Sequence, residues 1–164
     1  MRQFIATSLA TVAAALAPAL AISAAFLVFG GKEALPTLPL VFFFALFVAF
    51  LHTVLFGLLT AGWLLRIGKF RLLPMLLSGL LIGMVPAAIW NQPYKYADSQ
   101  TSSWSNGVQK LDNGVPTLSG WLDYLQFVGY AGLLGTVGAI AFYFVYKGMS
   151  PNNSFKPTPL RGAA

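Results

Sequence analysis

His52 is the one histidine of this chain, and its position makes it the clearest candidate for chemistry. It lies near the middle of an apolar stretch over residues 38–65, next to Thr53. An imidazole changes its charge near neutral pH, so it can carry a proton or line a path for a polar substrate. Ionisable side chains at membrane depth are costly, and they usually face the interior of a helix bundle or a cavity.

A second interpretation of His52 is purely structural. A neutral imidazole can donate a hydrogen bond to a carbonyl or hydroxyl group of a neighbouring helix. The apolar stretches hold no acidic residue away from their ends that could pair with the imidazole. We therefore expect the structural role, while His52 and Thr53 remain the candidate polar site within the membrane.

The rest of the composition leaves little for catalysis. The chain has no cysteine, one histidine and four acidic residues. It therefore has no thiol nucleophile and almost no ligands for a zinc or di-iron site. Glycine patterns for nucleotides, Ser/His/Asp arrangements and the zinc-protease motif HExxH are absent as well. We expect no enzyme activity, no metal and no cofactor.

Four long apolar stretches must position these side chains. A helix crosses a hydrocarbon core of roughly 30 Å with about 20 apolar residues, and each stretch comes close to that length or exceeds it. Only 9% of the residues are charged, against about a quarter in soluble domains, so the bilayer must act as the solvent. The stretches cover approximately residues 4–30, 38–65, 72–90 and 121–146.

The predicted fold is an all-α membrane protein. Residues 1–149 are expected to form one bundle of four transmembrane helices, with a long periplasmic loop at 91–120. A disordered cytoplasmic tail is expected at 150–164, because it is rich in proline and has no apolar periodicity.

The basic residues indicate how the chain crosses the membrane. Lys and Arg in short loops collect on the cytoplasmic side. One side of the four spans holds seven basic and no acidic residues, and the other side holds three basic and all four acidic residues. Both termini are therefore expected in the cytoplasm. The net charge is +6, but the basic residues do not gather on one helix, so we expect no binding to nucleic acid. The seven basic residues are Arg2, Arg66, Lys69, Arg71, Lys147, Lys156 and Arg161.

The first apolar stretch has an alternative interpretation as a cleaved signal peptide. Ala15-Leu16-Ala17 and Ala19-Leu20-Ala21 resemble cleavage sites with small residues. However, Pro18 directly follows the first of them, and the apolar run is longer than a signal peptide needs. We expect a retained first helix; cleavage would leave three spans and a periplasmic N-terminus.

Small residues at intervals of four occur in every stretch. Close backbone approach at such residues drives helix association in lipid. They can pack the four helices within one chain, or they can form the surface of a homo-oligomer; we expect packing within the chain because all four stretches show the pattern. The first stretch carries Ala13, Ala17, Ala21 and Ala25, and the glycines expected at helix contacts are Gly57, Gly79, Gly83, Gly132 and Gly135.

The loop at 91–120 is polar and long enough to carry a function of its own. Asn106-Gly107 and Asn113-Gly114 are turn signals, and the segment 108–111 between them is expected to form a short strand of a small hairpin. We expect the aromatic residues Tyr94, Tyr96 and Trp104 to rest at the membrane surface.

The last thirteen residues carry a resemblance of a different kind. The segment NNSFKPTPLRGAA at 152–164 closely resembles the translation of an attC recombination site, the end of a mobile integron gene cassette. The resemblance implies a bacterial gene whose reading frame runs into its recombination site. It leaves residues 1–150 without a recognised family.

Cassette genes often encode resistance, which raises the question of drug export. The small multidrug-resistance exporters are similar in having four short helices, but they rely on a glutamate within the first helix, and residues 4–30 contain no acid. We therefore expect a multi-pass inner-membrane protein that acts by helix packing or contact with a membrane partner or a second copy. The alternative is a small transporter or efflux subunit that uses His52.

Overall fold

Four helices that are long and apolar enough to cross a membrane make up most of the structure. The computed structural model describes residues 1–93 and 101–150 of the chain. The four candidate spans are Arg2–Ala34, Leu38–Arg66, Leu72–Trp90 and Leu118–Met149. Their length and composition confirm the predicted all-α class and the membrane character of the chain.

The spans consist of five α-helices and two short helical segments. The first span joins α1 to a 3₁₀ turn, η1, and the second span contains a π-helical segment, η2, between α2 and α3. The bounds are α1 Arg2–Gly30, η1 Gly31–Ala34, α2 Leu38–His52, η2 Thr53–Gly57, α3 Leu58–Arg66, α4 Leu72–Trp90 and α5 Leu118–Met149.

Helix α5 is three residues longer at each end than its predicted span at 121–146. It begins at Leu118 because the side chain of Thr117 accepts a hydrogen bond from the Gly120 N–H at 3.2 Å, which satisfies one of the free donors of the first turn. At 32 residues the helix is about 48 Å long, so it exceeds the hydrocarbon core.

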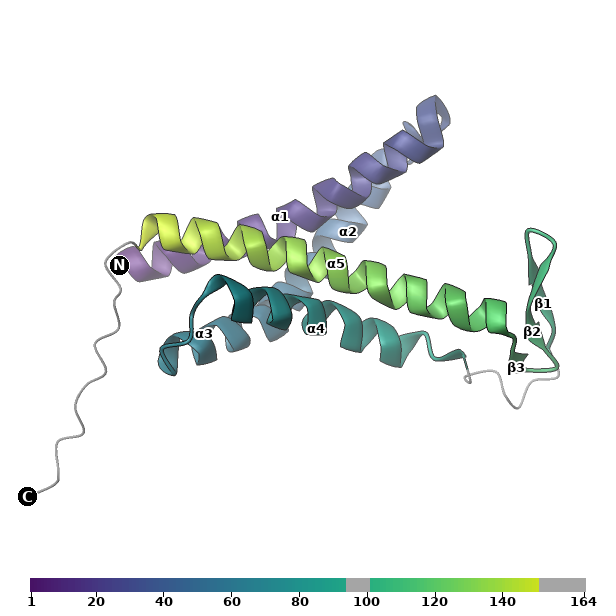
Figure 1. The fold of residues 1–164 in the computed structure, drawn as a ribbon. Coiled ribbons are helices and arrows are strands. Elements are labelled where there is room, and N and C mark those ends of the chain that lie inside the picture. The colour runs from purple at the N-terminus through teal and green to yellow at the C-terminus, as the bar shows by residue number, and fades with distance from the viewer. Residues whose placement is uncertain (94–100, 151–164) are drawn as a thin grey trace, which may run out of the picture.

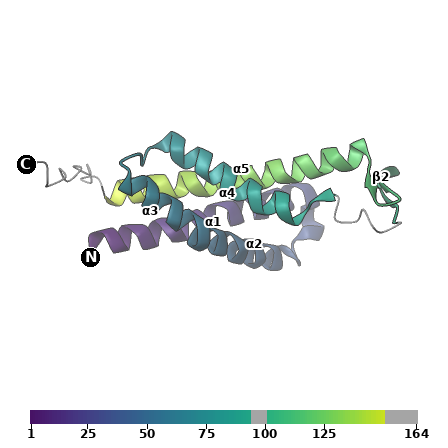
Figure 2. The same ribbon diagram turned by 90° about the horizontal axis from the view of Figure 1, so that it is seen from below.

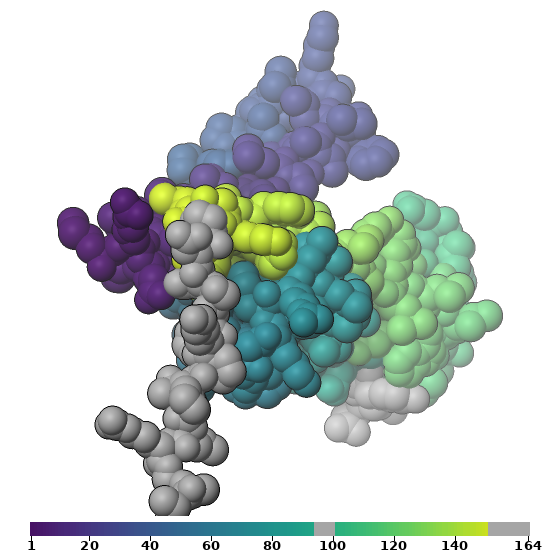
Figure 3. Space-filling view, turned by 60° about the vertical axis from the view of Figure 1, so that its left-hand side comes forward, coloured from purple at the N-terminus to yellow at the C-terminus, as the bar shows by residue number. Residues whose placement is uncertain are grey.

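The helices form two hairpins that meet at one end and separate at the other (Figures 1 and 2). Helix α5 packs against α4 along most of the length of α4, and α1 packs against both α2 and α5. In the space-filling view, the arm formed by the second half of α1, η1 and the neighbouring α2 stands apart from the rest as a separate lobe (Figure 3). The chain therefore leaves long faces of both hairpins uncovered.

The main core lies where the hairpins meet. It joins the first half of α1 to the end of α3, the start of α4 and the last turns of α5. Phe70 stacks on Tyr143 with a ring-centroid distance of 5.5 Å and meets the edge of Tyr146 at 5.1 Å. The buried members of this core are Ala6, Ala10, Ala14, Ala61, Leu64, Met75, Phe142, Tyr143 and Tyr146.

Helix α1 bends near its middle (Figure 1), and Pro18 is the proline inside it. Proline has no N–H, so the carbonyl of Ala14 loses its usual helical partner and the helix kinks. Gly138 of α5 lies against that carbonyl, because a Cβ built on Gly138 would be 2.9 Å from the Ala14 oxygen. The bend thus coincides with the point where α1 crosses α5.

The alanine stripe of α1 that meets other helices is not the one expected. Ala6, Ala10 and Ala14 are buried in the core, whereas Ala21 and Ala25 are exposed. Both stripes have the same spacing of four. Beyond Pro18, the buried positions of α1 are Ala19 and Ser23, and Ala21 and Ala25 lie on other sides of the helix.

Four of the five glycines predicted at helix contacts lie at one interface, between α4 and α5. A Cβ on Gly79 would lie 2.6 Å from the carbonyl oxygen of Gly135, and a Cβ on Gly83 would overlap the carbonyl of Ala131. Gly132 faces the side chains of Leu80 and Met84 on α4. The two backbones approach as closely as only glycine allows.

Gly57 behaves differently from the other four glycines. A Cβ on Gly57 would meet only Thr53 and His52, which belong to its own helical span. The position makes no close approach to another helix, so the structure does not bring Gly57 into a packing contact of the kind expected.

The loop after α4 contains a small antiparallel sheet of three strands, β1 Ser103–Ser105, β2 Val108–Asp112 and β3 Val115–Pro116, in the order β1-β2-β3. The predicted strand at 108–111 is confirmed. Both turns follow the Asn-Gly signals, with positive φ at all four turn residues, as short hairpin turns require. Tyr94 and Tyr96 lie outside the described residues, as does the predicted tail beyond Ser150.

Replacing Gly83 with Ile is expected to destabilise the fold by roughly 2–3 kcal/mol, because the new side chain would push α4 away from the Ala131 carbonyl. Gly62→Ile is the matched control, since no atom lies within 4 Å of a Cβ at Gly62. Unfolding in mixed detergent micelles, followed by tryptophan fluorescence, measures both variants. Equal stability of the two variants would contradict the close α4–α5 contact.

Candidate functional site

His52 ends α2 and is half-buried. Its Nδ1 donates a hydrogen bond to the carbonyl oxygen of Val48 at 2.9 Å. The ring also lies 6.0 Å, centroid to centroid, from the tilted ring of Phe56. The acceptor is one helical turn back on its own span, whereas the structural interpretation expected a neighbouring helix.

Thr53 repeats the pattern of His52 one residue later. Its hydroxyl donates to the carbonyl of Ala49 at 2.8 Å, and the Leu58 N–H bonds to the Thr53 carbonyl, which is the i−5 bond of a π-helix. A π-segment shifts the helix out of its regular ladder and often occurs at functional positions. Here the side chains of His52 and Thr53 bond to backbone carbonyls of the turn just before the π-helical hydrogen bonds begin.

The π-segment η2 lies between α2 and α3 and is in contact with two other helices. It contacts α1 and α4 in addition to its own span. A widened turn at this point rotates the second half of the span, so α2 can face α1 while α3 reaches the core near α4. The His52–Thr53 pair therefore lies where the second span changes from α-helical to π-helical hydrogen bonding.

A second polar group joins the small sheet to α5. The Lys110 ammonium forms an ion pair with the Asp123 carboxylate at 2.7 Å and donates to the Ser119 hydroxyl at 2.8 Å. The Thr117 hydroxyl donates to the carbonyl of Gln109 at 2.7 Å. Strand β2 is thereby fixed across the first turn of α5, and Gly120 fits against the Lys110 carbonyl.

A hollow of about 350 Å³ lies beside this ion pair, between the end of α4, the start of α5 and the sheet. The Tyr124 hydroxyl donates to the Ala88 carbonyl at 3.1 Å and holds the two helix ends together below it. Polar groups from both helices and aromatic rings line the hollow, including Trp90, Asn91, Lys110, Asp123, Tyr124 and Phe127.

A second hollow, of about 480 Å³, lies between α1 and α2 and is almost entirely apolar. It is open to the side of the hairpin. Leu16 lines it from α1, and Phe43, Phe47 and Phe50 line it from α2. Its depth in the span and its lining suit an apolar side chain or lipid chain rather than a polar ligand. His52 lines neither hollow.

Within residues 1–93 and 101–150, no three His, Cys, Asp or Glu side chains gather into a group that could hold a metal ion. Comparison of the chain with protein-family models, curated proteins and solved structures gave no match. The side chains and their geometry therefore carry the functional argument.

Two features of the site were not anticipated from the sequence. Lys110 and Asp123 are thirteen residues apart and were considered only as charges on one side of the membrane. The N-cap of α5 is Thr117 and not the nearby Ser119, because Thr117 accepts from the Gly120 N–H while Ser119 accepts from Lys110. Residue 120 is glycine and not the Glu or Gln of a capping box, so no short-range signal in the sequence distinguished Thr117 from Ser119.

Replacing His52 with Leu is expected to lower the free energy of unfolding by about 1 kcal/mol or less, because the imidazole donates to a carbonyl of its own helix. Thr60→Val is the matched control, since the Thr60 hydroxyl makes the same kind of bond to Phe56 at 2.8 Å. Unfolding in mixed micelles measures both. A loss several times larger than the control's would mean that the imidazole supports a second contact through Nε2.

Proposed function

We propose that this chain is a multi-pass protein of the bacterial inner membrane that acts by contact with another membrane protein and has no enzymatic activity. The resemblance of residues 152–164 to a translated recombination site supports a bacterial source on a mobile gene cassette. The four apolar spans support a location in the cell envelope.

The observation that carries this proposal is the exposure of the second span. In the most apolar 18-residue segment of each span, 6% of the residues are buried in Leu38–Arg66, against 33% in Leu118–Met149. Phe43, Phe44 and Phe47 are 60–69% exposed along one side of α2. A span that its own chain leaves so uncovered offers a long face to a partner helix, and the apolar hollow beside Phe47 can receive a bulky side chain.

Contact is better supported than transport through His52. The Nδ1 of His52 is used within its own helix, and the hollow nearest in the same hairpin has an almost entirely apolar lining. A transporter needs a polar path at this depth, whereas a partner helix can pack on an apolar surface with a hollow that receives its side chains.

A photo-crosslinking amino acid in place of Phe47, introduced in intact cells, is expected to give one discrete adduct with a single identified membrane protein. The same group in place of Leu81 is the matched control, because Leu81 is similarly exposed, at 58%, but belongs to α4 and not to the proposed face. Adducts with lipid alone at both positions would contradict the proposal. Drug efflux that His52→Ala abolishes would favour the transporter instead.

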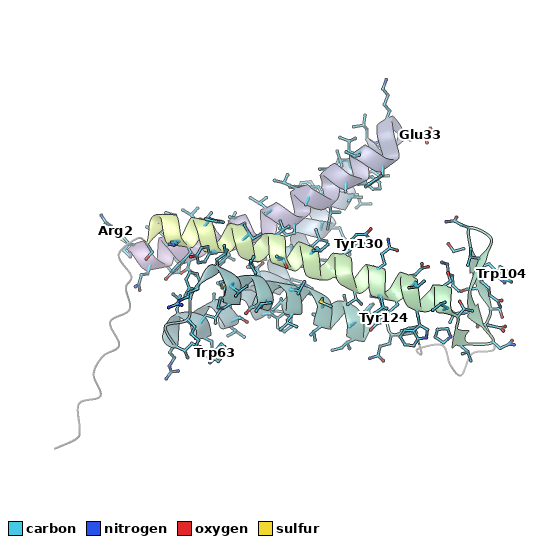
Figure 4. All side chains as sticks on the ribbon, viewed as in Figure 1. Arg2, Glu33, Trp63, Trp104, Tyr124 and Tyr130 are labelled. Atoms are coloured by element: carbon cyan, nitrogen blue, oxygen red, sulfur yellow. The ribbon has the colours of Figure 1, made fainter. Side chains whose placement is uncertain are left out.

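The proposed orientation places both termini in the cytoplasm. Arg2 and the α3–α4 turn share one end of the molecule, whereas Glu33 and Trp104 lie at the far ends of the two hairpins (Figure 4). The basic residues at the shared end support its cytoplasmic position.

The absence of cysteine allows a clean test of this orientation. Ser105→Cys is expected to react with a membrane-impermeant maleimide in intact cells, because the sheet would face the periplasm. Lys69→Cys in the α3–α4 turn is expected to react only after the membrane is opened. Both residues are exposed, so the reverse pattern of labelling would overturn the orientation.

A further inference from the structure

A polar pair lies on the side of α5 that faces away from α4. The Gln126 side-chain amide donates to the Tyr130 hydroxyl at 3.1 Å, and both residues are exposed. Tyr124 and Tyr130 leave the helix on different sides, and Tyr124 is the one that reaches α4 (Figure 4). Gly129 lies between the members of the pair, and a Cβ built there would meet nothing within 4 Å.

This pair lies within the hydrocarbon depth of the span. The bond from Tyr124 to the Ala88 carbonyl sets Tyr124 level with the last turn of α4. Gln126 and Tyr130 lie two and six residues further along α5, about 3 and 9 Å deeper at 1.5 Å per residue. Helix α4 has 19 residues and spans about 28 Å, so its last turn marks the edge of the core.

The pair leaves hydrogen-bonding capacity unused at this depth. Among the described residues, the Gln126 carbonyl oxygen accepts no bond and the Tyr130 hydroxyl donates none beyond the contact between them. Polar side chains in lipid are costly when unpaired, and in membrane proteins they bond across helices. The face needs a partner that supplies both donors and acceptors.

We propose that this face of α5, formed by Gln126, Gly129, Tyr130 and Leu133, pairs with the same face of a second copy of the chain. A glutamine amide carries donors and an acceptor, so two copies related by a twofold axis can bond reciprocally. Copies inserted in the same direction present parallel α5 helices, which places equal residues opposite each other. Gly129 at the crossing lets the two backbones approach closely.

The contact is separate from the one proposed at Phe47. It uses the α4–α5 hairpin, whereas the apolar hollow belongs to the α1–α2 hairpin. A second copy on α5 leaves the exposed side of α2 free for a different membrane protein. The two proposals therefore stand or fall on different measurements.

Single-cysteine variants of the full chain in lipid vesicles test the contact, since the natural sequence has no cysteine. Gly129→Cys is expected to form a disulfide-linked dimer with a copper–phenanthroline oxidant, because the two Cα atoms would lie within the roughly 7 Å that a disulfide spans. Phe127→Cys is the matched control: Phe127 is 51% exposed at nearly the same depth but about 200° around the helix. We expect at least a fivefold greater yield of dimer from Gly129→Cys.

A second variant tests the hydrogen bonds themselves. Adding Gln126→Leu to Gly129→Cys is expected to reduce the yield of dimer by about fivefold, the change that one ordinary hydrogen bond between membrane helices gives. The exposed position of Gln126 means that the monomer still folds. Equal crosslinking at positions 127 and 129, monomers at every protein-to-lipid ratio, or an unchanged yield with Gln126→Leu would each overturn the proposal.

Discussion

Direct contact between helix backbones holds this molecule together. Lipid chains are as apolar as leucine, so burying leucine against leucine gains little in a bilayer. Attraction between helices then depends on how closely the backbones approach. Helix α5 makes this approach twice, with Gly132 and Gly135 against α4 and with Gly138 against the free carbonyl of Ala14. The first contact joins α5 to α4, and the second joins α5 to α1.

The two contacts also explain why the hairpins separate. The glycines of the α4–α5 contact cover about one helical turn, and the Tyr124 bond to the Ala88 carbonyl holds these helices together at the end near the sheet. At Gly138, α5 meets Ala14 and Pro18 of α1, where α1 bends. Beyond the bend, α1 runs beside α2 and away from α5 (Figure 1), which leaves open faces on both hairpins. A membrane protein that works by contact needs such faces.

The outer sheet shows how the long helix α5 is used beyond the hydrocarbon. Its first turns provide Asp123 and Ser119 to Lys110, and Thr117 both caps the helix and donates a hydrogen bond to the Gln109 carbonyl of strand β2. Asp123 is about half exposed, so its ion pair with Lys110 contributes only about 1 kcal/mol or less. The shared backbone bonds of Thr117 supply the rest of the attachment. The small sheet is thereby fixed against the first turns of α5.

Sequence alone determined the spans, the strand at 108–111 and the glycines of the α4–α5 contact, because each depends on composition or spacing within a short segment. A span needs apolar length, a tight hairpin turn needs Asn-Gly, and a close approach needs glycine. Only the tertiary structure decided which alanine stripe of α1 is buried, since Ala6, Ala10 and Ala14 have the same spacing as the exposed residues after Pro18. It also decided that His52 bonds to its own helix, that Gly57 meets no neighbour, and that Lys110 pairs with Asp123. These outcomes depend on the direction in which each helix leaves its bend or π-segment, and that direction is set by contacts between residues distant in the chain.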